Sequence, residues 1–230
     1  MQTRPIQDTA ILIFAYTPAE DSRIKSIGTT VSLFSTLTQQ TLKTVKSTGM
    51  PYFHFTEKEQ HGANFGERFI NAIATVYKKG YANVITVGND SPQLKPFHLL
   101  EAKKQLKLDK TVLGPSLDGG FYLMGLHRSH FDTTLFLQLP WQSPGLLGKF
   151  SELLENQGAN IFKLPVLGDI DTLSDIFRLS SFIKTIPLSI LKILRSFTEK
   201  PVQNTVEGAD LPFYHFTSLY FNKGSPFILL

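Results

Sequence analysis

The sequence predicts an α/β protein, a three-layer α/β/α sandwich built on a mostly parallel, Rossmann-like sheet. Short runs of consecutive apolar residues, as in residues 10–15, are typical of strands that are covered on both faces. Segments with apolar residues at helical spacing separate these runs, and this alternation favours parallel strands joined by helices. With 230 residues, of which 42% are hydrophobic, the chain can form one large domain with a sizeable core.

The predicted elements alternate along most of the chain. Pro96 suits the first position of a helix, Gly80 suits the end of one, and residues 17–30 form a polar loop. Apolar or aromatic runs predict strands at residues 10–15, 51–55, 84–87, 111–114, 121–126 and 160–164. Apolar residues three or four positions apart predict helices at residues 31–48, 66–79, 96–107 and 144–157, and a capping-box-like pattern predicts another helix from Thr172.

The pattern changes after residue 180. We assign residues 8–180 to the α/β domain and residues 181–230 to an extension. Residues 182–197 indicate an amphipathic helix interrupted by Pro187. The tail is rich in aromatic and β-prone residues, and two interpretations stay open: an added hairpin, or a surface through which a homodimer forms.

The composition excludes several kinds of protein. Because the chain has no cysteine, disulfides and thiolate metal sites are excluded. No apolar run approaches the roughly 20 residues that cross a bilayer, and the first residues lack a cleavage-like pattern, so we expect a cytoplasmic protein. The net charge of +4 suits anionic small molecules. The lysines are scattered, so we expect no nucleic acid partner.

Acidic residues follow or precede the predicted strands at three places. Asp90 follows residues 84–87, Asp118 lies before residues 121–126, and Asp169 and Asp171 lie near the end of the alternating region. In sheets of this kind, ligands bind beyond the C-terminal ends of the strands. Mg²⁺ or Mn²⁺ that bridges nucleotide phosphates is held by one or two carboxylates. Asp90 and one of Asp169 and Asp171 could hold such an ion.

Other residues near these acids could contact a ligand. Gly119 and Gly120 would let the backbone approach it closely, and Trp141 could stack on a sugar or base. Structural interpretations stay open beside these. Asp90 could cap a turn, Asp118 could belong to an ordinary tight turn, the late acidic pair could start a helix, and the tryptophan could be packed in the core.

Taken together, these segments resemble a known family. They are "GNDSPQL", "LGPSLDGGFYLMGL", "LFLQLPWQSPGLL", "LGDIDTLSDI" and "NFGERFINAIATVYKKGYANVITVGND". In this order they are similar to a bacterial family of candidate glycosyltransferases, the radical-SAM/selenodomain-associated transferase type. Its fold is glycosyltransferase type A (GT-A), within the nucleotide-diphospho-sugar transferase superfamily. The resemblance extends over residues 10–180.

The resemblance implies a metal-dependent transfer from a nucleotide-activated donor to an unknown acceptor, with nucleotidyl transfer as the alternative to glycosyl transfer. Asp90 and Asp171 would bind Mg²⁺ or Mn²⁺, and Asp118 would be the catalytic residue that orients or deprotonates the acceptor. The residues implied in acceptor binding are Gly119, Gly120 and Trp141. The residues implied in nucleotide binding are Phe14, Ala15, Pro18, Arg23, Lys25, Arg68 and Gly88.

The first loop departs from the family pattern. The family reads Phe-Ala-Lys-x-Pro-x-x-Gly-x-x-Lys-Thr-Arg-Leu, whereas this chain reads "FAYTPAEDSRIKSIG". Tyr16 stands in the place of a lysine, the glycine is absent, and Lys25 is followed by serine. In the family such a loop wraps the donor phosphates, and this chain lacks some of its cations. Three alternatives therefore stay open: the protein uses a different donor, it binds the donor more weakly, or it is a catalytically degenerate binding or assembly protein. Arg23 and Lys25 could compensate.

Overall fold

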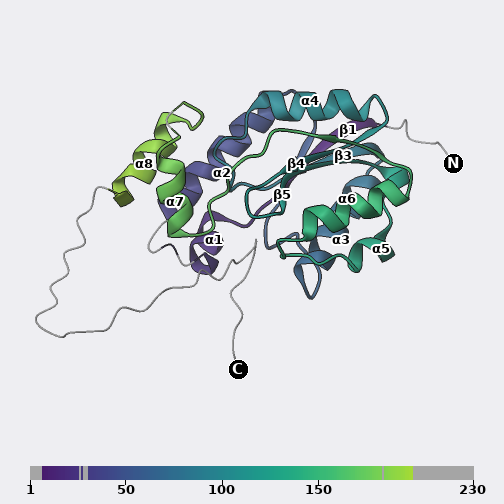
Figure 1. Ribbon diagram of the computed structural model, residues 1–230, viewed down its shortest axis with the longest axis horizontal. Helices are drawn as coiled ribbons and strands as arrows, with labels where there is room; N and C mark the ends of the chain where they lie inside the picture. Colours follow the sequence, from purple (N-terminus) through teal and green to yellow (C-terminus); the bar gives the residue numbers. More distant parts are fainter. Residues whose placement is uncertain (1–6, 26, 28–30, 183, 199–230) are drawn as a thin grey trace, which may run out of the picture.

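The computed structural model describes residues 7–25, 27, 31–182 and 184–198, which form an α/β sandwich (Figure 1). Its six-stranded sheet has the order β2-β1-β3-β5-β4-β6. β5 is antiparallel to β3 and β4, and every other neighbouring pair is parallel. The predicted mostly parallel sheet is therefore confirmed. The strands are β1 (Gln7–Phe14), β2 (Tyr52–Phe55), β3 (Tyr81–Val87), β4 (Lys110–Pro115), β5 (Phe121–His127) and β6 (Asn160–Lys163).

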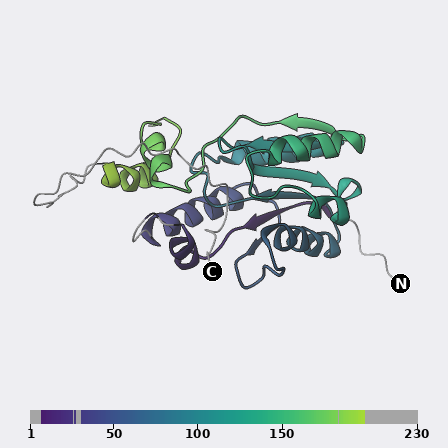
Figure 2. The ribbon, with the colours of Figure 1, turned by 60° about the horizontal axis from the view of Figure 1, so that its bottom comes forward.

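Helices cover both faces of the sheet, as the unbroken apolar runs predict (Figure 1, Figure 2). Successive residues of β1 point to opposite faces: Leu12 packs with α3, α5 and α6, whereas Ile11 packs with α2 and α4. Both side chains are 0% exposed. The helices are α1 (Pro18–Ile24), α2 (Val31–Lys46), α3 (Phe65–Lys78), α4 (Pro96–Leu106), α5 (Thr133–Leu137), α6 (Leu146–Asn156), α7 (Leu173–Ser180) and α8 (Leu188–Thr198), with a 3₁₀ turn at Arg128–His130.

Two short helices lie where the sequence predicts none. The prediction of a loop at residues 17–30 is wrong for residues 18–24, which form α1. Thr17 caps this helix, because its hydroxyl accepts a hydrogen bond from the Glu20 backbone N–H. The Glu57 carboxylate accepts bonds from the backbone and hydroxyl of Thr17, at 2.8 and 3.0 Å. α5 begins after Asp132, whose carboxylate caps its first turn. Such short helices carry no apolar repeat, and caps and distant contacts stabilise them instead.

One hydrophobic core lies on each face of the sheet, and a third core joins α2 to the C-terminal helices α7 and α8. α7 and α8 lie beside α2 at one end of the molecule (Figure 1). The predicted division of the chain at residue 180 stays a prediction. α2 lies before this boundary and α8 lies after it, and both helices contribute side chains to this core. The buried residues of the third core are Ile27, Leu33, Phe34, Leu37, Ile170, Ile176, Leu179, Ile186, Ile190, Leu191 and Leu194.

The described part of the chain has no helix with the length and apolar character needed to cross a membrane. The predicted helix at residues 182–197 is present from Leu188 to Thr198, and it follows Pro187. The tail, with its predicted hairpin or dimer surface, lies at residues 199–230, outside the described residues.

We predict that Leu194→Ala lowers the free energy of unfolding by about 2–5 kcal/mol, because the side chain is 0% exposed and its removal leaves a cavity beside α2. Leu188→Ala is the matched control on the same helix. Its side chain is 70% exposed, so a change within about 0.5 kcal/mol is expected. Urea denaturation measures both. Equal, small effects would show that α8 does not stabilise the domain.

Candidate functional site

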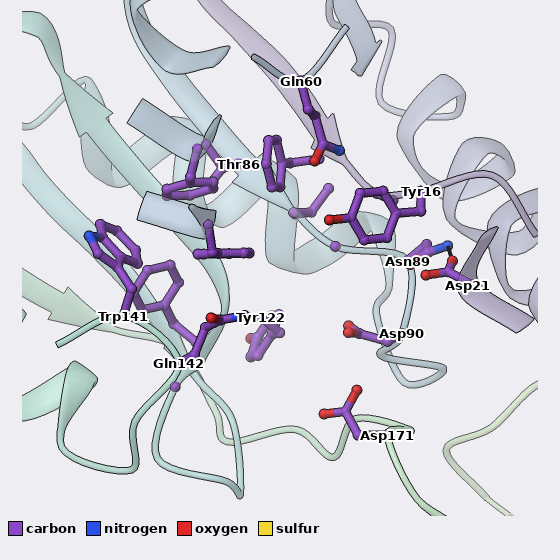
Figure 3. Close-up of a pocket in the computed structure, with 18 of the residues that line it drawn as sticks. Tyr16, Asp21, Gln60, Thr86, Asn89, Asp90, Tyr122, Trp141, Gln142 and Asp171 are labelled. Atoms are coloured by element: carbon purple, nitrogen blue, oxygen red, sulfur yellow. Dashed lines mark hydrogen bonds between the residues drawn. The ribbon is translucent and has the colours of Figure 1, made fainter. Parts of the chain in front are cut away.

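The carboxyl ends of β1 and β3 and the start of β5 open into one pocket (Figure 3). The first two strands are parallel, so their ends meet at the same edge of the sheet. Residues from α1, α3, the loop after β2, the segments before α6 and α7, and the first residue of α6 complete the lining. The predicted site residues that line this pocket are Phe14, Ala15, Lys25, Gly88, Asp90, Gly120, Trp141 and Asp171.

One side of the pocket is acidic. Figure 3 shows Asp90 and Asp171 next to each other, with Trp141 at the opposite side. The Lys25 ammonium lies 2.7 Å from Asp171 Oδ1 and 3.3 Å from Asp90 Oδ2. It also donates a hydrogen bond to the Ile170 carbonyl at 3.0 Å. The structure therefore brings together the two carboxylates that the sequence analysis paired, and joins them through a lysine.

The charge of Lys25 depends on these carboxylates. Its side chain is only 13% exposed, and burial by itself lowers the pKa of an ammonium. The negative charges of Asp171, Asp90 and Asp21 outweigh burial and raise the pKa of Lys25 above its ordinary value. Lys25 is therefore charged over the whole physiological range, and it partly neutralises the acidic side of the pocket.

Two further carboxylates adjoin this group. Oxygen atoms of Asp118, Asp169 and Asp171 all lie within 4.8 Å of one another. Asp118 Oδ1 accepts bonds from the Gly120 backbone, at 3.0 Å, and from the Ser116 hydroxyl. Asp118 Oδ2 is buried and has no hydrogen-bond partner among the described residues. Hard oxygen donors are thus concentrated here, and they are the kind of ligand that Mg²⁺ and Mn²⁺ take in proteins.

A buried hydrogen-bond network holds the loop after β3. Asn89 Nδ2 donates to Asp21 Oδ2 at 2.8 Å and to Thr38 Oγ1 at 2.9 Å. Asp21 is 4% exposed, and burial raises its pKa to about 6, although the Lys25 charge and the Asn89 bond act in the opposite direction. Since Asn89 precedes Asp90, this network joins α1 and α2 to the backbone that positions Asp90.

The opposite side of the pocket is aromatic. The rings of Phe65 and Phe69 stack with centroids 5.8 Å apart, and Trp141 meets Phe69 at 5.3 Å. The Trp141 indole donates to the Phe136 carbonyl at 2.8 Å, so its N–H is satisfied within the protein. Gly66 permits this packing, because a Cβ there would lie 2.5 Å from the indole. Trp141 therefore both packs in the protein and lines the pocket.

Gln60 supplies a polar group to the same pocket (Figure 3). Its side chain is 7% exposed, and its Nε2 donates to the Phe55 carbonyl at 2.9 Å. Its Oε1 is buried and has no hydrogen-bond partner in the described part of the chain. A buried acceptor without a partner is costly, so this oxygen is suited to an N–H or O–H group of a ligand.

Other predicted site residues do not line the pocket. Arg23 has a 71% exposed side chain and pairs with Glu20 at 2.6 Å. Arg68 donates to the Tyr16 hydroxyl at 3.2 Å, so it supports a lining residue. Gly119 has φ +89° and packs against Pro144, where a Cβ would overlap the backbone. The predicted residues outside the lining are Pro18, Arg23, Arg68, Asp118 and Gly119.

Sequence reasoning missed Asp21 and Gln60. Both lie beyond the C-terminal ends of predicted strands, at residues 10–15 and 51–55. The rule that drew attention to Asp90 therefore applied to them as well. Nothing in the sequence showed that either side chain would be buried, because that depends on α1 and on the loop after β2.

Comparison with known proteins places the chain in a family. The family model described as "Uncharacterized protein conserved in bacteria (DUF2064)" matches residues 14–143, more than half of the chain. The chain belongs to this family. The matched residues include the last residue of β1, all of α1 and β3, and the Asp118 turn, and so most of the pocket lining. No curated protein matches the chain.

Solved structures share the fold. A candidate nucleotide-diphospho-sugar transferase from Desulfovibrio desulfuricans G20 is 20% identical, with a TM-score of 0.69 over 83% of this chain and 95% of that one. This likeness shows a nucleotide-diphospho-sugar transferase-like fold. More distant likenesses are 4-diphosphocytidyl-2C-methyl-D-erythritol synthase from Anaerococcus prevotii DSM 20548 (11% identity, TM-score 0.49, 77% and 99% covered) and a manganese complex of Rv0371c from Mycobacterium tuberculosis H37Rv (16%, 0.41, 75% and 97%).

We predict that Asp21→Asn weakens the pH dependence of stability. In the unfolded chain this carboxyl titrates near its ordinary pKa of 3.8, whereas in the fold its pKa is about 6. The folded state therefore holds the proton more tightly, and the free energy of unfolding falls as the pH rises from about 4 to about 6. This difference in pKa corresponds to a fall of about 3 kcal/mol in the free energy of unfolding. Asp21→Asn should not show this fall, because an amide does not titrate.

Urea denaturation between pH 4 and pH 7 measures this effect. Glu20→Gln is the control. The hydrogen bond from Arg23 lowers the pKa of Glu20, so this carboxylate makes the free energy of unfolding rise with pH. Its replacement therefore cannot abolish a fall in the free energy of unfolding with rising pH. A wild-type decline retained in Asp21→Asn would contradict the assignment of this titration to Asp21.

Proposed function

We propose that this protein is a divalent-metal-dependent transferase that uses a nucleotide-activated donor. Glycosyl transfer is the proposed reaction, with nucleotidyl transfer as the alternative, and the protein is proposed to be of the radical-SAM/selenodomain-associated transferase type. The observation that carries this proposal is the convergence of Asp90 and Asp171 on one side of a pocket whose other side is aromatic. A cytoplasmic location and a homodimer formed through residues 181–230 stay predictions.

The acidic side fits a divalent cation. Asp90 and Asp171 face one ammonium, and Asp118 and Asp169 place further oxygens beside Asp171. Asp118 Oδ2 is buried without a hydrogen-bond partner among the described residues. It can therefore bind a metal ion or accept a hydrogen bond without first breaking another hydrogen bond. When bound, Mg²⁺ or Mn²⁺ would neutralise the donor phosphates and the charge that develops on the leaving group.

The residues around this side have complementary roles. Lys25 can donate a charged hydrogen bond to a phosphate oxygen from its place between the two carboxylates. Gly88 leaves room for Asp90, because a Cβ at residue 88 would lie 3.0 Å from Asp90 Oδ1. Asp118, fixed by the Gly120 backbone, is the proposed residue that orients or deprotonates the acceptor hydroxyl.

The aromatic side fits the planar or apolar part of the donor or acceptor. Phe14, Phe65 and Trp141 present ring surfaces to the pocket, and such surfaces stack on bases and sugars. Gln60 offers its buried acceptor in the same pocket, which suits an N–H of a nucleobase. A ligand with a base at one end and phosphates at the other therefore matches both sides of the pocket.

We predict that a nucleotide or nucleotide sugar stabilises the protein only when Mn²⁺ or Mg²⁺ is present. At a hundredfold excess over Kd, the free energy of unfolding should rise by about 2.7 kcal/mol. Asp90→Asn should remove this gain, because it removes a charged ligand of the ion. Thermal shift with a panel of nucleotides and nucleotide sugars, with and without the metal, measures it.

Asp109→Asn is the matched control. Asp109 is an exposed carboxylate before β4, and its φ of +54° is one that asparagine tolerates. This variant should keep the metal-dependent gain. Nucleotide binding that is independent of metal would favour a catalytically degenerate binding protein, and no response to any nucleotide would contradict the proposed donor.

We predict that Gln60→Met lowers nucleotide affinity by roughly 5- to 10-fold, because one neutral hydrogen bond to the base is lost. Mn²⁺ binding should be unchanged, since the acidic side of the pocket keeps all its carboxylates. Calorimetric titrations of Mn²⁺ and of the nucleotide found in the panel separate the two effects. An unchanged nucleotide affinity would show that the base lies elsewhere.

A further inference from the structure

We infer that Lys25 and a divalent cation are alternative counter-ions of Asp90 and Asp171, so that Lys25 keeps the metal site closed until donor phosphates draw its ammonium away. This inference rests on the metal site of the proposed function. It concerns what the lysine does before the donor binds, and it makes metal binding depend on the nucleotide.

The geometry of Lys25 is that of an ion held in a site. Its Nζ lies 2.7 Å from Asp171 Oδ1, 3.3 Å from Asp90 Oδ2 and 3.0 Å from the Ile170 carbonyl oxygen. The face of the Phe34 ring lies on another side of it, with the centroid 5.7 Å away. Oxygens of two carboxylates and a carbonyl are also the donors that a hard divalent cation takes.

The two cations cannot share these oxygens at low cost. A divalent ion binds carboxylate oxygens at about 2.0–2.6 Å, so it would stand within a few ångströms of the ammonium. Repulsion between like charges at such a distance is strong, especially where the side chains are only 10–14% exposed. Binding of metal alone therefore requires the lysine to give up its contacts with both carboxylates.

Donor phosphates would replace the contacts that the lysine gives up. Lys25 lies at the end of α1, and its flexible side chain can turn from the carboxylates to a phosphate oxygen in the same pocket. The acidic pair is then free for the divalent ion. Metal and nucleotide should therefore each raise the affinity for the other, which is a positive coupling between the two ligands.

The test is a titration with Mn²⁺ alone, with the free ion measured by electron paramagnetic resonance. Lys25→Met should bind Mn²⁺ at least about tenfold more tightly than the wild type, because the competing cation is gone. Arg23→Met is the matched control: it removes the same charge from the same helix, but its side chain is 71% exposed and pairs with Glu20. It should bind Mn²⁺ as the wild type does.

Lys25→Gln guards against loss of folding in the methionine variant, since it keeps hydrogen-bonding capacity without the charge. It should also bind Mn²⁺ more tightly, and Lys25→Arg should not. Equal affinities in the wild type and the uncharged variants would overturn the inference, while leaving the metal site intact if Asp90→Asn abolishes binding. Absence of Mn²⁺ binding in every variant would overturn both the inference and the metal-dependent function.

Discussion

The shared ion pair of Lys25 with Asp90 and Asp171 is the interaction on which the pocket depends. These residues come from the end of α1, the end of β3 and the segment before α7. Two carboxylates that converge in a buried place repel each other and resist ionisation unless a cation compensates them. The Ile170 backbone N–H, which donates to the Asp90 carbonyl at 3.0 Å, holds the same segments together independently of charge. The acidic side therefore exists only because three distant segments meet.

The pocket joins two unlike surfaces. Its acidic side needs a cation, its opposite side is aromatic, and Gln60 offers a buried acceptor in the same pocket. Charges interact more strongly where water is excluded, so each carboxylate affects its neighbours more than it would at the surface. The altered first loop also has a physical consequence. Asp21 adds a third acidic group near Lys25, and its negative charge contributes to raising the pKa of the ammonium, after those of Asp171 and Asp90.

Much of the fold could be predicted from the pattern of apolar residues in the sequence alone. Strands such as β1 and β3 are buried on both faces, so their unbroken apolar runs revealed a covered sheet. The same rule placed Asp90 in the ligand-binding edge of that sheet. α1 and α5 were missed because they are short and are stabilised by Thr17, Glu57 and Asp132 through caps and distant bonds that leave no repeat. Asp118 was paired with the acceptor by resemblance, but its closeness to Asp169 and Asp171 had no signal along the chain.

The sequence by itself determined the layer architecture and the edge of the sheet at which polar residues gather, because strand burial and chain direction are local properties that repeat along the chain. Only the tertiary structure decided which of those residues touch. Lys25 is 65 residues from Asp90 and 145 from Ile170, and such contacts depend on how the crossover helices return the chain to the sheet. Burial of Asp21 and Gln60 was decided in the same way, since a side chain becomes buried only when distant segments cover it.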